Sequence, residues 1–281
     1  MKTGINNPIL KTLFYALLII WGISVLYPLL WTLLDALKDN GQFFLHSPWA
    51  LPNLPLIWEN FSYVWDKYNF GAYFVNSLIV TAGSTVLGLI LAATTAYVLA
   101  RYKFRGSGGL YLLYISSMMI PFVLALIPLF FLMNSMQLIN TKIGLIMVYA
   151  SSILAFGIFV LVGFFKSLPK ELEEAAITDG ASHYGTFFRV MLPLSQPGLI
   201  TVAIVNILNI WNEYIVGTVL VNDPKQYTIP VEIGVMQAEM QYRTEWGPLF
   251  AGLFISIVPV LIIYIFFQRR IASGITAGAI K

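Results

Sequence analysis

The sequence predicts an all-α integral membrane protein with six transmembrane helices. Hydrophobic residues make up 58% of its 281 residues and charged residues only 10%, whereas a soluble domain carries about 25% charged residues. Six apolar segments each approach the roughly 20 residues that a membrane-spanning helix needs. Lysine and arginine are also distributed unevenly among the segments between them. Together these observations indicate a polytopic membrane protein.

We expect a single transmembrane domain over residues 1–281, in which the spans cover approximately 13–34, 74–100, 110–133, 143–165, 198–220 and 248–267. The first apolar segment is longer than the core of a secretory signal, and no cleavage site of small residues follows it. We therefore interpret it as a retained signal-anchor helix. No internal repeat or soluble domain is evident.

The basic residues predict the orientation of the chain, because cytoplasmic loops are enriched in lysine and arginine. With a cytoplasmic N-terminus, the inside segments hold eleven of the sixteen basic residues: Lys2, Lys11, Arg101, Lys103, Arg105, Lys166, Lys170, Arg189, Arg269, Arg270 and Lys281. The outside segments hold the other five: Lys38, Lys67, Lys142, Lys225 and Arg243. Both termini should therefore be cytoplasmic in a multi-pass membrane protein.

Several classes of function lack their sequence signals. The chain has no cysteine, and its two histidines, His46 and His183, lie far apart without clustered partners, which argues against a zinc or iron site. No phosphate-binding loop of the form G-x-x-x-x-G-K-[ST] occurs, so the chain itself is not built to hydrolyse ATP. The net charge of +3 gives no indication of nucleic-acid binding. We expect no catalytic residue and no cofactor on this chain.

Two outside segments are long, about 35–73 and 221–247. The first contains three prolines and the tryptophans Trp49, Trp58 and Trp65. Tryptophan is favoured at the membrane interface, so these residues could form an aromatic belt that anchors the helices. They could instead belong to a docking surface for an extracytoplasmic partner.

The longest inside loop, residues 166–197, predicts two short helices. The first should run from about Pro169 to Thr178 and stop at Asp179-Gly180, because glycine tolerates the left-handed conformation that ends many helices. Ser182 can cap the second helix. In that helix an apolar face repeats at i, i+3, i+4 and i+7, formed by Tyr184, Phe187, Phe188 and Met191. The apolar faces could lie on the lipid surface or in a pocket of another protein.

The fifth apolar segment carries a polar stripe. Asn206, Asn209 and Glu213 recur at i, i+3 and i+7, hence on one helical face, with Asn212 beside them. Such a stripe indicates hydrogen bonds between helices or the wall of a wet cavity. Sugars suit amide and carboxylate partners with an aromatic surface, which these residues and Tyr214 could offer. Both interpretations remain open at this point.

The inside loop resembles the signature loop of permease subunits from binding-protein-dependent ABC importers, E-A-A-x3-G-x9-I-x-L-P. The matching positions are Glu174-Ala175-Ala176, Gly180 and Leu192-Pro193, with Val190 in place of the isoleucine. Further matches are Trp211-Asn212-Glu213-Tyr214, Thr244-Glu245-Trp246 and the tail from Gly274 to Gly278. The resemblance is to the carbohydrate-uptake branch, similar to the smaller maltose permease subunit.

The resemblance implies a type I ABC importer permease fold and a coupling helix that sits in a groove of a cytoplasmic ATPase. The coupling residues would be Glu174, Ala175, Ala176, Asp179, Gly180, Leu192 and Pro193. The implied partners are a second homologous permease subunit in a heterodimer, a cytoplasmic ATPase dimer that binds ATP and Mg, an extracytoplasmic solute-binding protein and membrane lipid. The tail would reach the ATPase dimer interface.

The implied function is import of a sugar or oligosaccharide through the cell (inner) membrane of a bacterium or archaeon. A polyol, a glycerol phosphate ester or an acidic oligosaccharide is an alternative solute. An ion-driven secondary transporter is a more distant alternative, for which Glu213 is nearly the only candidate coupling charge. In the maltose system most contacts with the solute are expected on the other subunit, so the polar stripe could simply complete the wall of the pathway.

Overall fold

A computed structural model describes residues 8–240, 242 and 244–277, with side chains as far as Gln268, and in this part of the chain all regular elements are helical. In chain order they are α1 (Pro8–Ala36), α2 (Asn40–Leu45), α3 (Glu59–Lys67), α4 (Phe70–Arg101), α5 (Ser107–Ser117), a 3-10 turn (Phe122–Ala125), α6 (Leu126–Ser135), α7 (Lys142–Ser167), α8 (Glu171–Thr178), α9 (His183–Thr186), a π-helical turn (Phe187–Met191), α10 (Leu192–Leu194), α11 (Gln196–Trp211), α12 (Ile215–Leu220), a 3-10 turn (Pro224–Gln226), α13 (Ile229–Glu239) and α14 (Trp246–Ala277). Residues 278–281 and the side chains from Arg269 onward lie outside the described part of the chain. The predicted contact of the tail with the ATPase dimer interface falls largely on these residues.

The described helices accommodate the six predicted spans. Four continuous helices are long and apolar enough to cross a membrane: α1, α4, α7 and the part of α14 from Trp246 to Gln268. Two bent helix pairs bring the number to six. The all-α prediction is confirmed, and the four continuous helices extend a few residues beyond most of the predicted boundaries.

The third predicted span is not one straight helix. α5 ends at Ser117, and the chain resumes as Phe122–Ser135 after a bend of 99°. Pro121 lies at this break, and its ring supplies no N–H to continue the α5 hydrogen-bond ladder. The span therefore consists of two shorter helices.

The fifth predicted span also breaks, so the prediction of a continuous helix to Leu220 is wrong. α11 ends at Trp211, and α12 begins at Ile215. The carboxylate of Glu213 accepts hydrogen bonds from the backbone N–H groups of Val216 and Gly217, at 2.9 and 3.2 Å. A side chain that caps the start of a new helix in this way competes with continuation of the old one.

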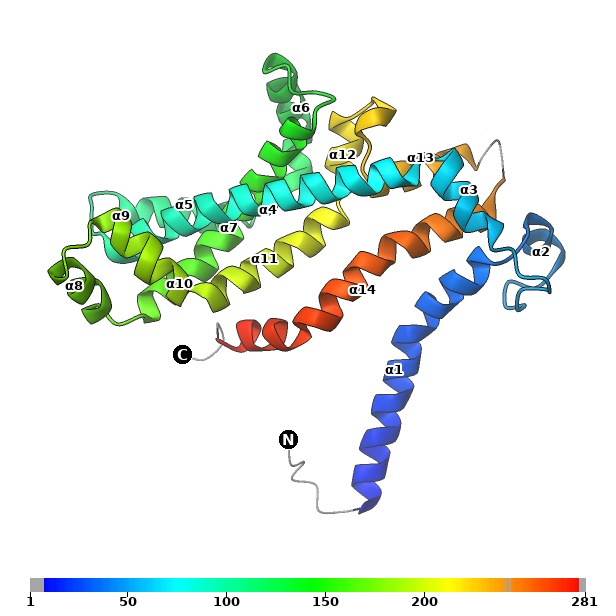
Figure 1. The fold of residues 1–281 in the computed structure, drawn as a ribbon, viewed down its shortest axis with the longest axis horizontal. Helices are drawn as coiled ribbons and strands as arrows, with labels where there is room; N and C mark the ends of the chain where they lie inside the picture. Colours follow the sequence, from blue (N-terminus) through cyan, green and yellow to red (C-terminus); the bar gives the residue numbers. More distant parts are fainter. Residues whose placement is uncertain (1–7, 241, 243, 278–281) are drawn as a thin grey trace. The chain divides into compact units, whose positions relative to one another are not determined.

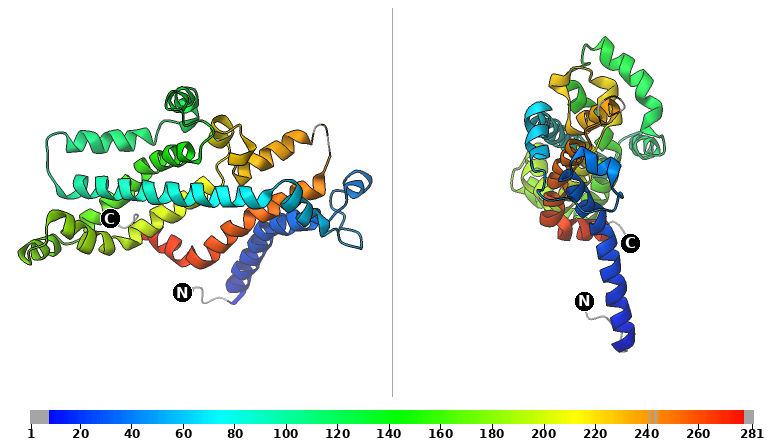
Figure 2. Two further views of the ribbon diagram at one scale, coloured as in Figure 1. Left: turned by 45° about the horizontal axis from the view of Figure 1, so that its top comes forward. Right: turned by 90° about the vertical axis from the view of Figure 1, so that its right-hand side faces the viewer.

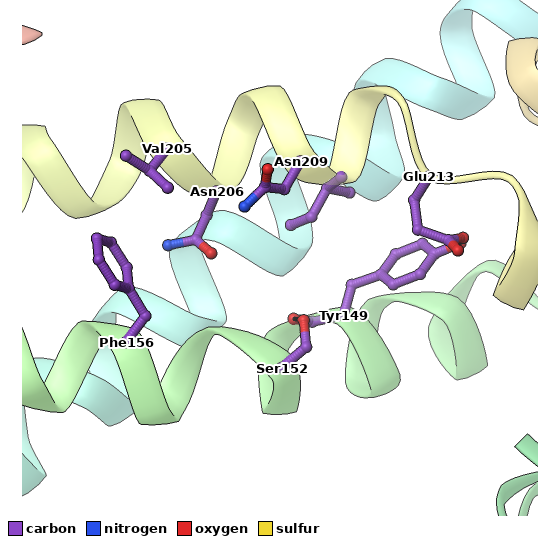
Figure 3. Close-up of a pocket in the computed structure, with 8 residues that line it drawn as sticks. Tyr149, Ser152, Phe156, Val205, Asn206, Asn209 and Glu213 are labelled. Atoms are coloured by element: carbon purple, nitrogen blue, oxygen red, sulfur yellow. Dashed lines mark hydrogen bonds between the residues drawn. The ribbon is translucent and has the colours of Figure 1, made fainter. Parts of the chain in front are cut away.

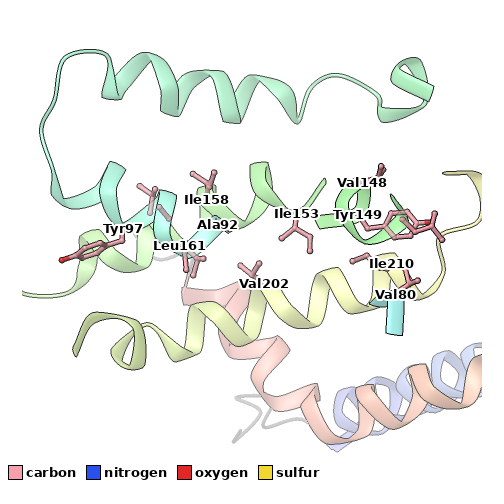
Figure 4. Packing of buried hydrophobic residues seen from close by; sticks show 14 of the residues in the cluster. Val80, Ala92, Tyr97, Val148, Tyr149, Ile153, Ile158, Leu161, Val202 and Ile210 are labelled. Atoms are coloured by element: carbon pink, nitrogen blue, oxygen red, sulfur yellow. The ribbon is translucent and has the colours of Figure 1, made fainter. Parts of the chain in front are cut away.

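The chain packs as two compact units. The first comprises residues 1–71 and 233–258, and the second comprises residues 72–232 and 259–281. Within the second unit α4, α7 and α11 lie side by side (Figure 1), and their buried side chains form one apolar core (Figure 4).

The three core helices approach closely because small residues lie between them. A Cβ atom added to Gly157 of α7 would lie 2.9 Å from Cβ of Ala92 on α4 and 3.4 Å from Val202 on α11. A larger residue there would push two helices apart. Small residues at helix contacts are typical of membrane helices, which associate through van der Waals packing.

The loop that the sequence predicted to hold two short helices lies at one end of this core. α8, α9 and α10 lie at the C-terminal end of α4, as Figure 1 and the left view of Figure 2 show. Tyr97, one turn before that end, packs against Phe165 of α7 and Phe187 of the π-helical turn, with ring centroids 5.5 and 4.9 Å apart. The second half of the loop is thereby fixed to two of the three core helices.

Candidate functional site

The first half of the inside loop folds as predicted from its residues. α8 begins at Glu171, two residues later than expected, and ends at Thr178. Gly180 then adopts a φ of +86°, the left-handed conformation expected for an Asp-Gly helix stop. Ser182 caps the next helix, since its hydroxyl oxygen accepts a hydrogen bond of 3.1 Å from the N–H of Gly185.

The second half of the loop differs from the prediction of one helix with an aromatic face. Residues 187–191 form a π-helical turn, which has more residues per turn than an α-helix, so positions spaced for an α-helical face no longer align. Phe187 and Met191 are buried, whereas Tyr184 is 80% exposed and Phe188 is 55% exposed. The four side chains therefore divide between the core and the surface.

α8 presents small, acidic and apolar side chains to its surroundings. No residue of this helix is buried. Of the predicted coupling residues, Glu174, Ala175, Asp179, Gly180 and Pro193 are exposed, and Ala176 and Leu192 are half-buried. A Cβ added to Gly180 would meet no atom within 4 Å. This surface is open to a lipid layer or to another protein.

The polar stripe of the fifth span faces a pocket of about 350 Å³ between α7 and α11 (Figure 3). Its walls are formed by Tyr149, Ser152 and Phe156 of α7, by Val205, Asn206, Asn209 and Ile210 of α11, and by Glu213. No basic side chain occurs in this lining. The structure thus brings together three of the predicted pathway residues: Asn206, Asn209 and Glu213.

The other two predicted pathway residues lie outside the pocket lining. Asn212 is exposed, and its side chain donates a hydrogen bond of 2.7 Å to the carbonyl of Leu208 on its own helix. Tyr214 is 44% exposed at the start of α12. Because the helix breaks after Trp211, neither residue lies on the helical face that lines the pocket.

Glu213 is the most constrained polar group of the pocket. Besides the two N–H groups at the start of α12, it accepts a hydrogen bond of 2.5 Å from the hydroxyl of Tyr149 on α7. A carboxylate that accepts several such bonds is strongly held in place. Glu213 therefore joins α7 to the helix break and has little freedom to turn toward a solute.

The asparagine side chains have spare hydrogen-bonding capacity. The amide nitrogen of Asn206 donates to the carbonyl of Val202 at 2.7 Å, which leaves its carbonyl oxygen available. The amide of Asn209 makes no hydrogen bond with any described residue of the chain, and the residue is exposed to the pocket. An amide that offers both a donor and an acceptor can bind a hydroxyl group in either direction.

The sequence reading missed the α7 wall of the pocket. Tyr149, Ser152 and Phe156 recur at i, i+3 and i+7, the same spacing that identified the stripe on the fifth span. The signal was therefore present in Tyr149 and Ser152, which interrupt an otherwise apolar segment. A comparison of polar faces between spans could have found it.

The other unit contains a fixed polar cluster in its two long connecting segments. The two oxygens of Glu245 accept hydrogen bonds from the hydroxyls of Tyr63 and Tyr68, at 2.8 and 2.9 Å, and Lys67 lies 3.5 Å from the same carboxylate. Burial, and secondly the bond to Glu245, raise the pKa of Tyr68 well above its ordinary value. Asn40 holds the neighbouring backbone through Thr244 and Trp246.

The three tryptophans predicted to lie at the outer face are on the surface of this unit. Trp49, Trp58 and Trp65 are all exposed. Exposure of these side chains suits both an aromatic belt at the membrane interface and a docking surface.

We predict that Tyr149→Phe lowers the stability of the protein by about 1.5–3 kcal/mol, because Glu213 loses a hydrogen bond to a charged group. Thermal unfolding in detergent would measure the effect as a lower melting temperature. Tyr214→Phe serves as the control, because the Tyr214 hydroxyl makes no hydrogen bond with any described residue and its ring is exposed. Equal melting temperatures for the two variants would show that Glu213 does not depend on Tyr149.

Three comparisons relate the chain to known proteins. A family described as binding-protein-dependent transport system inner membrane component matches residues 84–276. The diacetylchitobiose uptake system permease protein NgcG of Streptomyces coelicolor is 39% identical over 267 residues, which cover 95% of this chain and 88% of that protein. The probable starch degradation products transport system permease protein AmyC of Thermoanaerobacterium thermosulfurigenes is 32% identical over 280 residues, covering 100% and 99% of the two chains.

The fold is also found among solved structures. A chain of a bacterial ABC transporter involved in the import of the acidic polysaccharide alginate superposes with a TM-score of 0.80, covering 96% of this chain and 99% of that one. At 22% identity the likeness concerns the fold, which agrees with the expected type I importer permease.

Proposed function

Because the chain belongs to the family of binding-protein-dependent transport system inner membrane components, we propose that it is the permease subunit of an ATP-driven importer for a sugar or oligosaccharide. Membership implies an ATPase and a solute-binding protein as partners. The named relatives transport diacetylchitobiose and products of starch degradation, which supports a carbohydrate as the solute.

The proposal that this loop couples transport to the ATPase rests on the exposed surface of α8. Four of the predicted coupling residues are exposed: Glu174, Ala175, Asp179 and Gly180. The apolar side chains of Leu172 and Ile177, in the same segment, are exposed as well. Exposed apolar groups beside small residues fit a protein groove, where the backbone can approach closely. Ala176, Leu192 and Pro193 complete this coupling surface.

ATP hydrolysis belongs to a separate ATPase dimer in this proposal, and ATP and Mg bind there. No cofactor is assigned to this chain. A second, homologous permease subunit completes a heterodimer and the other half of the pathway. With both termini in the cytoplasm, α8 faces the ATPase, and the two long connecting segments face the solute-binding protein outside the cell (inner) membrane.

The pocket between α7 and α11 is the proposed part of the solute pathway on this chain. Asn206 and Asn209 provide amides for hydroxyl groups, and Phe156 provides an aromatic surface. Asn212 and Tyr214 lie outside this lining, and we assign them no contact with the solute. Because none of the described residues that line the pocket is basic, we expect an uncharged sugar to fit it better than an acidic oligosaccharide or a phosphate ester.

A secondary transporter remains the competing function. Such a protein would need a titratable group that can exchange an ion. Glu213 is held by three hydrogen bonds that join α7 to α12, which favours a structural role over ion exchange.

We expect Gly180→Trp to release the ATPase from the transporter while the second permease subunit stays bound, because the bulky side chain occupies the proposed contact. The measurement is affinity purification of the tagged chain from its native membrane in mild detergent. Gly106→Trp is a matched control, since Gly106 also has a positive φ, of +94°, and no atom near its added Cβ. Retention of the ATPase by Gly180→Trp would remove the loop from the contact, and purification of an active wild-type chain alone would favour the secondary transporter.

Asn209→Ala should raise the half-saturation concentration for uptake about fivefold, since a lost neutral hydrogen bond costs about 1 kcal/mol. The assay is uptake of labelled diacetylchitobiose and maltose into proteoliposomes that contain the complete importer. Asn212→Ala, on the exposed side of the same segment, should leave the value unchanged. Identical kinetics for both variants and the wild type would place the solute contacts on the second subunit.

A further inference from the structure

The end of α4 is connected to the start of α8 by a buried ion pair. Arg101 is the last residue of α4, and its Nε lies 3.3 Å from Oε1 of Glu173 in the first turn of α8. Its Nη2 donates a hydrogen bond of 2.8 Å to the carbonyl of Leu168, in the turn between α7 and α8. The Arg101 side chain is only 5% exposed and that of Glu173 only 17%. One guanidinium group thus holds both the helix and the turn that precedes it.

Besides this ion pair, α8 contacts α9 and the π-helical turn, which follow it in the chain. None of its residues is buried, so apolar packing fixes it weakly. The other two ion pairs recorded in the described residues, Lys38 with Asp35 and Lys67 with Glu245, belong to the other unit. Within the described part of residues 72–232 and 259–268, Arg101 and Glu173 therefore form the one ion pair.

The second half of the loop is attached in a different way. Phe187 and Met191 are buried in the core, and Phe187 packs against Tyr97 of α4. The hydroxyl of Tyr102 also lies 3.1 Å from Nδ1 of His183 at the start of α9. Apolar packing would therefore secure α9 and the π-helical turn to α4 without any contribution from Arg101.

The ion pair between Arg101 and Glu173 is of a kind that should stay intact when force acts on α8. Removal of one partner from a buried ion pair leaves the other charge without compensation, which is strongly unfavourable. Arginine presents several donors in a rigid plane, so it can hold a carboxylate and a carbonyl at once, whereas the single ammonium group of lysine lacks this geometry.

We infer that Arg101 is a positioning residue that transmits the movement of α8 to α4 through Glu173. This inference depends on the proposed role of α8 as the contact with the ATPase. Force applied to the exposed surface of α8 would reach α4 through the ion pair and reach α7 through Leu168. Without the pair, α8 would follow the ATPase while α4 followed more loosely.

A distance measurement between two spin labels tests the link without knowledge of the solute. This chain contains no cysteine, so Thr178→Cys on α8 and Val86→Cys on α4 become its two labelling sites, in an importer whose partner subunits have their reactive cysteines replaced. The complete importer is purified and measured without nucleotide and with ATP and vanadate. In the wild type we expect a narrow distribution with the same mean distance in both states. In Arg101→Gln and in Glu173→Gln we expect the distribution with ATP and vanadate to widen at least about twofold, as for a broken link.

Controls separate this role from general damage. Arg105→Gln and Glu171→Gln remove exposed charges close to the pair and should keep the narrow distribution. Arg101→Lys should behave like Arg101→Gln, and the charge-swapped Arg101→Glu with Glu173→Arg should narrow the distribution again. Wild-type distances in both single glutamine variants, with the ATPase bound, would overturn the inference. If the ATPase did not bind the wild-type chain, the proposed function would fail instead.

Discussion

The arrangement of this protein depends on the need to satisfy backbone hydrogen bonds where water is scarce. Inside a membrane a helix can break only where other groups pair with the freed N–H and C=O groups. At the break after Trp211 the carboxylate of Glu213 supplies that pairing for α12, and the same carboxylate receives the hydroxyl of Tyr149 from α7. A single side chain, that of Glu213, therefore stabilises the helix break, holds α7 beside it and forms one end of the pocket wall.

The polar side chains of the second unit then fall into two kinds. Glu213 and Arg101 are held by several partners and connect elements to one another. Asn209 is exposed to the pocket and forms no hydrogen bond with the described chain. A polar group with unused hydrogen-bonding capacity suits a ligand that changes during transport, whereas a group held by several partners suits a permanent joint.

The sequence predicts those features that arise from local interactions. Span positions follow from hydropathy, and the left-handed Gly180 and the cap at Ser182 follow from short-range backbone preferences. Features that need a distant partner were not predictable: Glu213 meets Tyr149, and Arg101 meets Glu173, only after the helices pack. The π-helical turn is such a case too, because burial of Phe187 and Met191 in the core outweighs the regular α-helical spacing.

Coupling of transport to ATP hydrolysis requires that α8 contact the ATPase, and site-specific cross-linking detects this contact. This chain has no cysteine of its own, so a thiol-reactive photoprobe attaches to the purified, tagged Ala175→Cys importer at one defined position of the chain before it is returned to membranes. We expect a cross-linked product that contains the ATPase, whereas the same group at Trp49→Cys, in the other unit, should give none. Products that contain only lipid from Ala175→Cys, in a preparation that still transports, would contradict it.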